Sequence, residues 1–278
     1  MDVILSEFQS DLSVISHQLD LIDQIKKLSA TPSLADRYRT AAEKKSGRST
    51  DSSHLRSFLL ESDAFQHSAR ASNAGLPIAC GTMALYIAGR FEEYTRTSFE
   101  DLCQKLAQNA SSFKSLPKKM QESLITFTAL VIHSPRKYQH GEGAVAGFTE
   151  NLAANLSAKA CADKINYQCL SITDSNMRPD TLSELYERIG AKEIWKRISQ
   201  QSNIQTYFAT TDASNAESLS KKKLSALMDL RNSIAHPSTS FTWPSTDEVR
   251  DYIKFLGILG GALSGISSAF AVTLCQNT

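Results

Sequence analysis

Three residues near the C-terminus have types and a spacing that suit phosphodiester chemistry. Arg231, Asn232 and His236 lie within the string LRNSIAHP. Arginine is always charged and can hold a phosphate through two parallel N–H donors, and histidine is the side chain whose protonation changes near neutral pH. Such a pair fits phosphodiester cleavage without a metal. The two cations are also ordinary residues at a helix end, because both interact favourably with the helix dipole.

One helix must position these three side chains. Ser214 and Glu217 have the spacing of a capping box, so the sequence predicts a helix that starts at Ser214, and the apolar residues after it keep a helical period. Pro237 lacks an N–H and disfavours a helical conformation of the residue before it, so the helix should end near His236. Asn232 would then lie one turn before His236, on the same face.

The string LRNSIAHP resembles the R-N-x-x-A-H form of the R-x4–6-H motif of the HEPN superfamily. The segment ALYIAGRFEEYTR resembles the long early helix of HEPN domains, and SNMRPDTLSELYERIG resembles the RiboL-PSP group of that superfamily. The resemblance implies an all-α fold, an antiparallel helical bundle with an N-terminal helical extension. It also implies that Arg231 stabilises the phosphate, that His236 acts as acid or base, and that Asn232 orients or binds the substrate. Some toxin relatives carry a tyrosine two residues after the histidine, and Ser238 stands there in this chain.

As an enzyme of this kind, the chain would be a metal-independent endoribonuclease that cleaves RNA by attack of the 2′-hydroxyl. The context would be a toxin, an anti-phage defence system or RNA processing, and no cofactor or metal is expected. One histidine cannot easily serve both the attacking hydroxyl and the leaving oxygen, so the resemblance implies a homodimer in which two copies share one cleft. A toxin context leaves room for a neutralising or regulatory protein partner. The alternative is a non-catalytic HEPN module that binds a nucleotide or a partner protein.

Five further residues are candidates for binding the RNA. Glu92 and Glu93 belong to the predicted early helix, and we expect one of them to line the cleft. Arg136 and Lys137 lie in a basic, glycine-rich stretch that could contact the RNA backbone, and Lys222 lies on the predicted motif helix. A solvated face, an internal ion pair or a plain surface loop is the simpler interpretation of each.

The composition favours a globular, helical protein of the cytoplasm. The chain has 278 residues, of which 41% are hydrophobic, with only 12 Gly and 7 Pro. Lys and Arg number 30 against 29 Asp and Glu, so no overall basic field indicates nucleic acid. The five cysteines are widely spaced and form no C-x-x-C pair, which favours neither a disulfide framework nor a zinc site. The first residues, MDVILSEF, lack the basic region of a signal peptide.

The sequence divides into a predicted N-terminal helical extension, residues 1–75, and a HEPN-like helical domain, residues 76–278. A long amphipathic helix is expected up to about Ala30, followed by a polar connector with a loop at 46–53.

The last predicted helix is charge-free from Phe255 to Thr278 and long enough to span a membrane. Glycine and serine dilute this run and no basic flank follows, which favours a core helix and no membrane partner. A helical scaffold that lies on a membrane is the weaker alternative. The short connection after the motif predicts that this helix is the antiparallel neighbour of the motif helix.

Overall fold

The structure is a computed structural model that describes residues 2–33, 36–37, 40, 53–157, 164–238 and 241–275. Within these ranges every regular element is an α-helix or a short 3-10 helix, which confirms the predicted all-α class. The loop predicted at 46–53 lies, apart from its last residue, outside the described residues.

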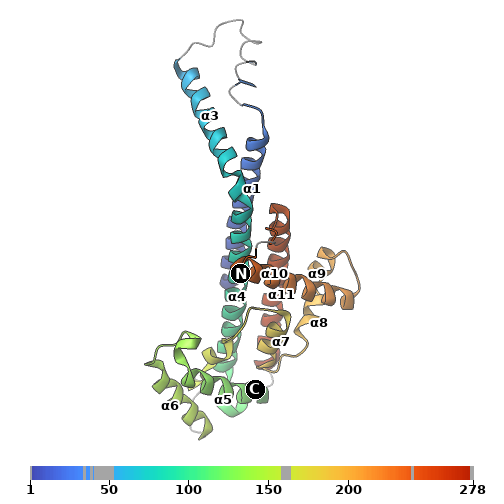
Figure 1. The fold of residues 1–278 in the computed structure, drawn as a ribbon. Helices are drawn as coiled ribbons and strands as arrows, with labels where there is room; N and C mark the ends of the chain where they lie inside the picture. The colour runs from blue at the N-terminus through green and yellow to red at the C-terminus, as the bar shows by residue number, and fades with distance from the viewer. Residues whose placement is uncertain are drawn as a thin grey trace.

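A long helical hairpin projects from the body of the molecule (Figure 1). Helix α1 (Val3–Ala30) runs outward, and α3 (Ser53–Ser72) returns beside it. One 3-10 turn, η1 (Asn73–Gly75), then leads directly into α4 (Leu76–Asn109). We call α1 and α3 together the stalk. The Gln66 amide ties its two helices, because it donates hydrogen bonds to the carbonyls of Leu28 and Thr31 at 3.1 and 2.6 Å.

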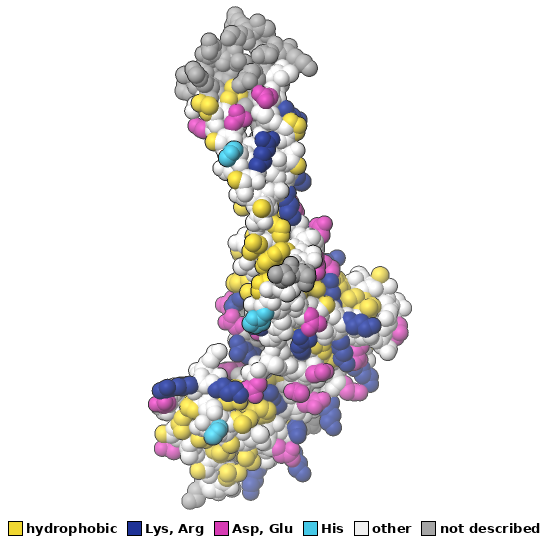
Figure 2. All heavy atoms as spheres, viewed as in Figure 1, with side chains coloured by type: hydrophobic (Ala, Val, Ile, Leu, Met, Phe, Trp, Pro, Cys, Tyr) yellow, Lys and Arg dark blue, Asp and Glu magenta, His cyan; other side chains and the backbone are white. Residues whose placement is uncertain are grey.

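Hydrophobic side chains remain exposed on the stalk (Figure 2). Phe58 and Phe65 of α3 are 52% and 61% exposed, and Val14 and Leu21 of α1 are 51% and 59% exposed. The inner faces of the same helices are buried, as the amphipathic pattern of α1 predicts. The stalk is therefore apolar on its inner face and in part on its outer face.

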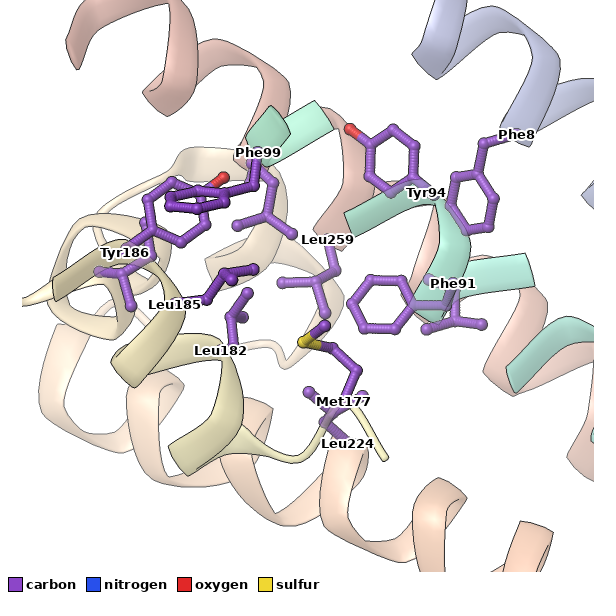
Figure 3. Packing of buried hydrophobic residues seen from close by; sticks show 14 of the residues in the cluster. Phe8, Phe91, Tyr94, Phe99, Met177, Leu182, Leu185, Tyr186, Leu224 and Leu259 are labelled. Carbon is purple, nitrogen blue, oxygen red and sulfur yellow. The ribbon is translucent and has the colours of Figure 1, made fainter. Parts of the chain in front are cut away.

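Helix α4 is the centre of the hydrophobic core. It packs against α1, against α10 (Ala213–Ala235) and against α11 (Thr246–Cys275). Figure 3 shows Phe91 and Phe99 of α4 among side chains from these helices and from the segment around α7 (Pro179–Glu187). Tyr94 stacks on Phe8 of α1 with 4.5 Å between ring centroids and donates a hydrogen bond to the carbonyl of Gly260 at 2.7 Å. Helix α1 thus shares the main core, and the proposed boundary at residue 75 stays a prediction.

The remaining helices form a lower lobe and a cover over α10. In the lower lobe lie η2 (Phe113–Ser115), α5 (Lys118–His133), η3 (Pro135–Tyr138), α6 (Ala144–Leu156) and η5 (Tyr167–Ser171). Two short helices, α8 (Ile194–Ser199) and α9 (Ser202–Tyr207), pack against α10.

The final helix α11 packs mainly along α4 and α1, so the prediction that it is the antiparallel neighbour of the motif helix was wrong. It runs antiparallel to α1 instead, because Thr246 donates to Asp23 and Ser264 donates to Asp2. Core packing decides this arrangement, since α11 buries a long apolar face that α4 and α1 together cover.

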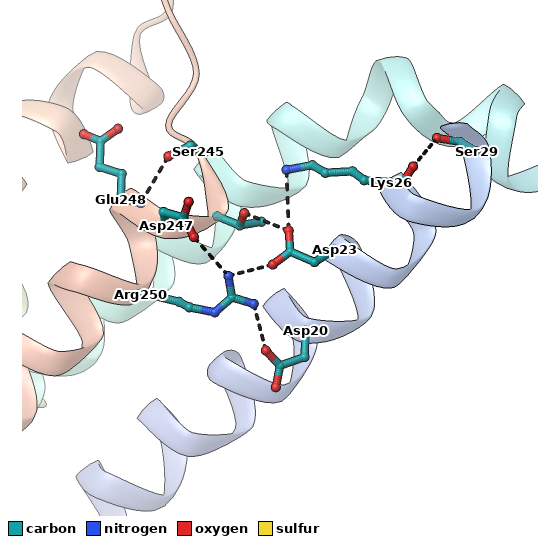
Figure 4. A network of polar contacts seen from close by, with 9 residues as sticks. Asp20, Asp23, Lys26, Ser29, Ser245, Asp247, Glu248 and Arg250 are labelled. Atoms are coloured by element: carbon teal, nitrogen blue, oxygen red, sulfur yellow. Dashed lines mark hydrogen bonds and ion pairs between the residues drawn. The ribbon is translucent and has the colours of Figure 1, made fainter. Parts of the chain in front are cut away.

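A network of ion pairs between side chains joins the start of α11 to α1 (Figure 4). The Arg250 guanidinium lies 2.7 Å from a carboxylate oxygen of Asp20 and 2.7 Å from one of Asp23. Burial acts to raise the pKa of Asp23, but the hydrogen bond from Thr246 and the guanidinium of Arg250 together lower it below its usual value.

Two described helices are long and apolar enough to cross a membrane by length and composition alone, at 57–109 and 246–273. Both also bury apolar faces in the core, which is the role that the sequence predicts for α11.

Candidate active site

Helix α10 carries the motif and begins earlier than predicted. Its N-cap is Asp212, whose carboxylate accepts a hydrogen bond from the Ser214 N–H at 2.9 Å, so Ser214 is not the cap. Aspartate caps a helix as well as serine does, and here it stands two residues earlier in the chain. The predicted end is confirmed, because the helix stops at Ala235 and the His236 N–H donates to the Asn232 carbonyl at 3.1 Å.

Arg231 and Asn232 are half-buried and joined to a segment far away in sequence. The side-chain oxygen of Asn232 accepts hydrogen bonds from the Asn176 amide at 2.7 Å and from Arg231 Nη1 at 3.3 Å. No carboxylate among the described residues pairs with Arg231, and its Nε–H is buried without a partner. The printed contact of its Nη1 group is with Asn232 and not with a carboxylate, so the Nη–H donors of this half-buried guanidinium could hold a bound anion.

His236 lies at the end of α10 and is exposed. Its imidazole forms no hydrogen bond or ion pair with the part of the chain that the structure describes. The unpaired carbonyls of the last turn favour a positive charge beside them. The ring is therefore free to meet a substrate or a second protein chain.

The segment 174–178 forms the wall beside the motif. Met177 is 1% exposed and inserts its side chain into the core, and its N–H donates to Glu92 Oε1 of α4 at 3.2 Å. Arg178, the next residue, pairs with Asp229 of α10 at 2.6 Å. Glu92 thus reaches the neighbourhood of the motif by holding this segment. Sequence reasoning gave Asn176 and Arg178 no role, although both lie in the segment SNMRPDTLSELYERIG, because a local pattern does not show that this segment contacts α10.

The loop that follows the motif is held on α4 through Gly81. The Trp243 ring lies so close to this glycine that an added Cβ would be 2.4 and 2.5 Å from its Cε3 and Cζ3 atoms. The same Cβ would lie 3.7 Å from Cγ1 of Ile234, two residues before the histidine. The chain is therefore docked on one point of α4 both before and after His236.

Glu93 and Lys222 are not brought to the motif. Glu93 forms an ion pair with Arg90 on the same helix, and Arg90 also pairs with Asp11 of α1 at 2.5 Å. Lys222 is exposed and precedes His236 by 14 residues, which is about 21 Å along a helix.

Arg136 and Lys137 lie in the lower lobe, on η3. The exposed Arg136 pairs with Glu142 at 2.8 Å. Lys137 pairs with Asp174 at 2.8 Å, and the hydrogen bond raises the pKa of Lys137 above its usual value. Asp174 is two residues from Asn176, so only the lysine approaches the wall of the site.

Cys80, Cys103 and Cys169 are free and buried. Burial raises the pKa of the Cys169 thiol to about 11, so it is a poor nucleophile near neutral pH. Among the described residues, no group of three or more His, Cys, Asp or Glu side chains is placed to hold a metal ion.

An all-α bundle that carries an arginine, an asparagine and a histidine at the end of one core helix defines the class as HEPN-like. The chain matches the family model RiboL-PSP-HEPN over residues 51–266, and it belongs to this family. The match includes α4, the segment before α7 and the motif, and it leaves out α1. No curated protein and no solved structure matches the chain. Membership of the family is consistent with ribonuclease-type or nucleotide-related roles.

Proposed function

We propose that the chain is a metal-independent endoribonuclease that cleaves RNA by attack of a 2′-hydroxyl on the adjacent phosphate. The observation that carries the proposal is the half-buried guanidinium of Arg231, which pairs with no carboxylate of the described residues and lies on the helix that ends at the exposed His236. Cations that interact more strongly with the pentacoordinate phosphate than with the ground state lower the barrier to cleavage. Arg231 is the residue to which we assign this role.

Each motif residue has one task in this reaction. The 2′-oxygen forms a bond to phosphorus while the bond to the 5′-oxygen breaks, which leaves a 2′,3′-cyclic phosphate and a 5′-hydroxyl. His236 accepts the proton of the attacking hydroxyl or donates one to the leaving oxygen. Asn232 contacts Arg231 and is itself held by Asn176, so it orients the guanidinium.

The two proton transfers occur at opposite ends of the in-line path, which favours a site built from two chains. A two-fold axis would bring a second His236 to the cleft, and the exposure of this residue leaves it accessible to another copy. The active species we propose is a homodimer of the cytoplasm that acts on RNA in a toxin, anti-phage defence or RNA-processing system, with or without a regulatory protein partner.

Incubation of the purified protein with mixed RNA in excess EDTA tests the proposal. We expect cleavage to continue and the fragments to carry 2′,3′-cyclic phosphate or 3′-phosphate ends. Fragments with 3′-hydroxyl ends, or a strict need for Mg²⁺, would contradict it.

The His236→Ala variant should cleave about 10²- to 10⁴-fold more slowly, because proton transfer by a positioned side chain contributes about that much. His17→Ala is the matched control, since His17 is also an exposed histidine but lies on α1. Circular dichroism and thermal unfolding should show that both variants fold as the wild type does. If His236→Ala cleaves RNA as fast as the wild type, the assignment of a ribonuclease is refuted. If the wild type binds RNA without cleaving it, the alternative of a non-catalytic module is favoured.

A further inference from the structure

A polar hollow lies on α4, next to the segment that leads to the wall of the candidate site. It has a volume of about 380 Å³ and is bounded by α4, by the segment 137–140 at η3 and by the segment 168–173 around the end of η5. This volume falls in the range of pockets that hold small molecules. The chemical step proposed above uses none of the residues that line this hollow.

The hollow and the motif share one wall. Thr173 lines the hollow, and Asn176, three residues further on, contacts Asn232 of the motif. On α4, Glu92 holds this same segment through Met177, and Arg96 lies one turn later and lines the hollow. A strand of RNA whose phosphate lay at Arg231 could therefore place a neighbouring nucleotide here.

The charged groups of the hollow are mixed in sign. Arg96 is half-buried and pairs with no carboxylate in the described part of the chain. Glu100, one turn further along α4, accepts a hydrogen bond from the Ser171 hydroxyl at 2.9 Å through one carboxylate oxygen. The bond fixes the carboxylate and leaves its other oxygen available as an acceptor. Lys137 and Glu93 also line the hollow, but Asp174 and Arg90 respectively pair with them.

The Arg96 guanidinium donates hydrogen bonds and the neighbouring Glu100 carboxylate accepts them, so the pair fits a nucleobase. A phosphate fits less well, because Glu100 would repel an anion. Guanine matches both groups. Its O6 and N7 accept two hydrogen bonds from an arginine, and its N1–H and exocyclic amine donate to a carboxylate. Uracil offers two carbonyl oxygens and a single N–H, and adenine offers no acceptor where guanine has O6.

We propose that this hollow is a base-recognition subsite that holds an unpaired guanine of the RNA, with Arg96 and Glu100 reading its edges. Proteins read RNA sequence mostly through unstacked bases of single strands, and Tyr138 and His140 add rings to the same wall. The proposal rests on the proposed function for its substrate. It adds a sequence preference that is independent of the chemical step.

Binding of short single-stranded oligoadenylates that carry one guanine at each position in turn tests the subsite. The protein is the full-length His236→Ala variant, so cleavage does not interfere, and fluorescence anisotropy gives the Kd. We expect guanine at one position to increase affinity about 5- to 150-fold, which is the discrimination of one good bidentate pair. No increase at any position, or no binding of any oligonucleotide, would overturn the proposal.

Variants identify the residues that read the base. Arg96→Ala and Glu100→Gln, each in the His236→Ala background, should abolish the preference for guanine. Lys105→Ala and Asp101→Asn are the matched controls, because they change the same charges on the same helix outside this hollow. The preference should survive in both, and its persistence in Arg96→Ala would refute the assignment.

The two proposals fail in different ways. Wild-type protein that prefers the guanine oligonucleotide but never cleaves RNA would keep the subsite and remove the nuclease. Wild-type protein that cleaves every sequence equally, with a His236→Ala variant that binds without preference, would keep the nuclease and remove the subsite.

Discussion

The contact between Gly81 and Trp243 gives a quantitative prediction. In Gly81→Ala, the added Cβ would lie 2.4 Å from the indole, whereas ordinary contact begins at 3.4 Å, so the ring must move by about 1 Å. Overpacking of this kind costs about 1–3 kcal/mol. Alanine also favours the helix over glycine by about 0.5–1 kcal/mol, so the net change in the free energy of unfolding should lie between about zero and 2.5 kcal/mol of destabilisation.

Gly89→Ala on the same helix separates the two contributions. Apart from the neighbouring backbone of its own helix, no described atom lies within 4 Å of a Cβ added at Gly89, so this variant should gain the helix propensity alone. We expect Gly81→Ala to be less stable than Gly89→Ala by about 1–3 kcal/mol, or lower in Tm by roughly 2–12 °C at 2–4 °C per kcal/mol. Thermal and urea unfolding measure the difference. A Gly81→Ala protein as stable as Gly89→Ala would refute the packing argument.

Removal of the indole tests the cause of the effect. In a double-mutant cycle with Trp243→Leu, the two substitutions should be non-additive, because the added methyl no longer meets a ring. The displaced loop also follows His236 directly, and a shift of about 1 Å at a catalytic group can reduce a rate by about 10²-fold. Gly81→Ala should therefore lose more activity than Gly89→Ala, and Trp243→Leu should not restore it. Additive stabilities would show that the two residues do not interact.

Four other predictions concern the ion network, the last helix and the assembly. Arg250→Ala should reduce the free energy of unfolding by about 1–3 kcal/mol in urea, because the partly buried Asp23 loses its ion pair with the guanidinium and keeps only weaker contacts such as the hydrogen bond from Thr246; an unchanged midpoint would contradict this. Because the pKa of Asp23 is lowered, its contribution to the free energy of unfolding is present above about pH 4 and is lost as the pH falls further. The stability of the wild type should therefore fall more steeply below about pH 4 than that of Arg250→Ala. Parallel plots of stability against pH would disprove the linkage. If α11 is a core helix, the full-length protein should stay in the supernatant after high-speed centrifugation of a lysate, and recovery only in the membrane pellet would favour the membrane alternative. If the site is shared by two chains, excess His236→Ala chains should depress wild-type activity below simple dilution after subunit exchange, and activity proportional to the wild-type fraction would exclude a site that needs both histidines.

Local signals in the sequence predicted the helix that carries the motif. Two local signals, the spacing of the apolar residues and the position of Pro237, predict where this helix ends. The end of α10 at Ala235 agrees with both. The N-cap was wrong by two residues, because Asp212 and Ser214 are both good caps and the sequence pattern alone favoured Ser214. The position of Lys222 could have been excluded beforehand, since helix rise alone separates it from His236.

Contacts between distant residues could not be predicted in this way. The hydrogen bond from Asn176 to Asn232 joins residues 56 apart, and the Glu92 carboxylate meets the Met177 N–H across 85 residues. Periodicity reports which face of a helix is apolar, and it does not report which other element covers that face. The same limit explains why the predicted neighbour of α11 was wrong: the short connecting loop suggested α10, whereas the apolar face of α11 packs against α4 and α1.

Helix α4 also sets the distances between three parts of the site. Gly81 contacts the loop after the motif, Glu92 holds the wall beside it, and Arg96 lines the neighbouring hollow. They span 15 residues, or about 22 Å, and the rise and rotation of one helix fix their mutual positions. A single residue inserted between Gly81 and Arg96 would turn everything beyond it by about 100° and so separate these contacts from one another. We therefore expect the contacts of this chain to tolerate a change in the length of a connecting loop better than a change in the number of residues between Gly81 and Arg96.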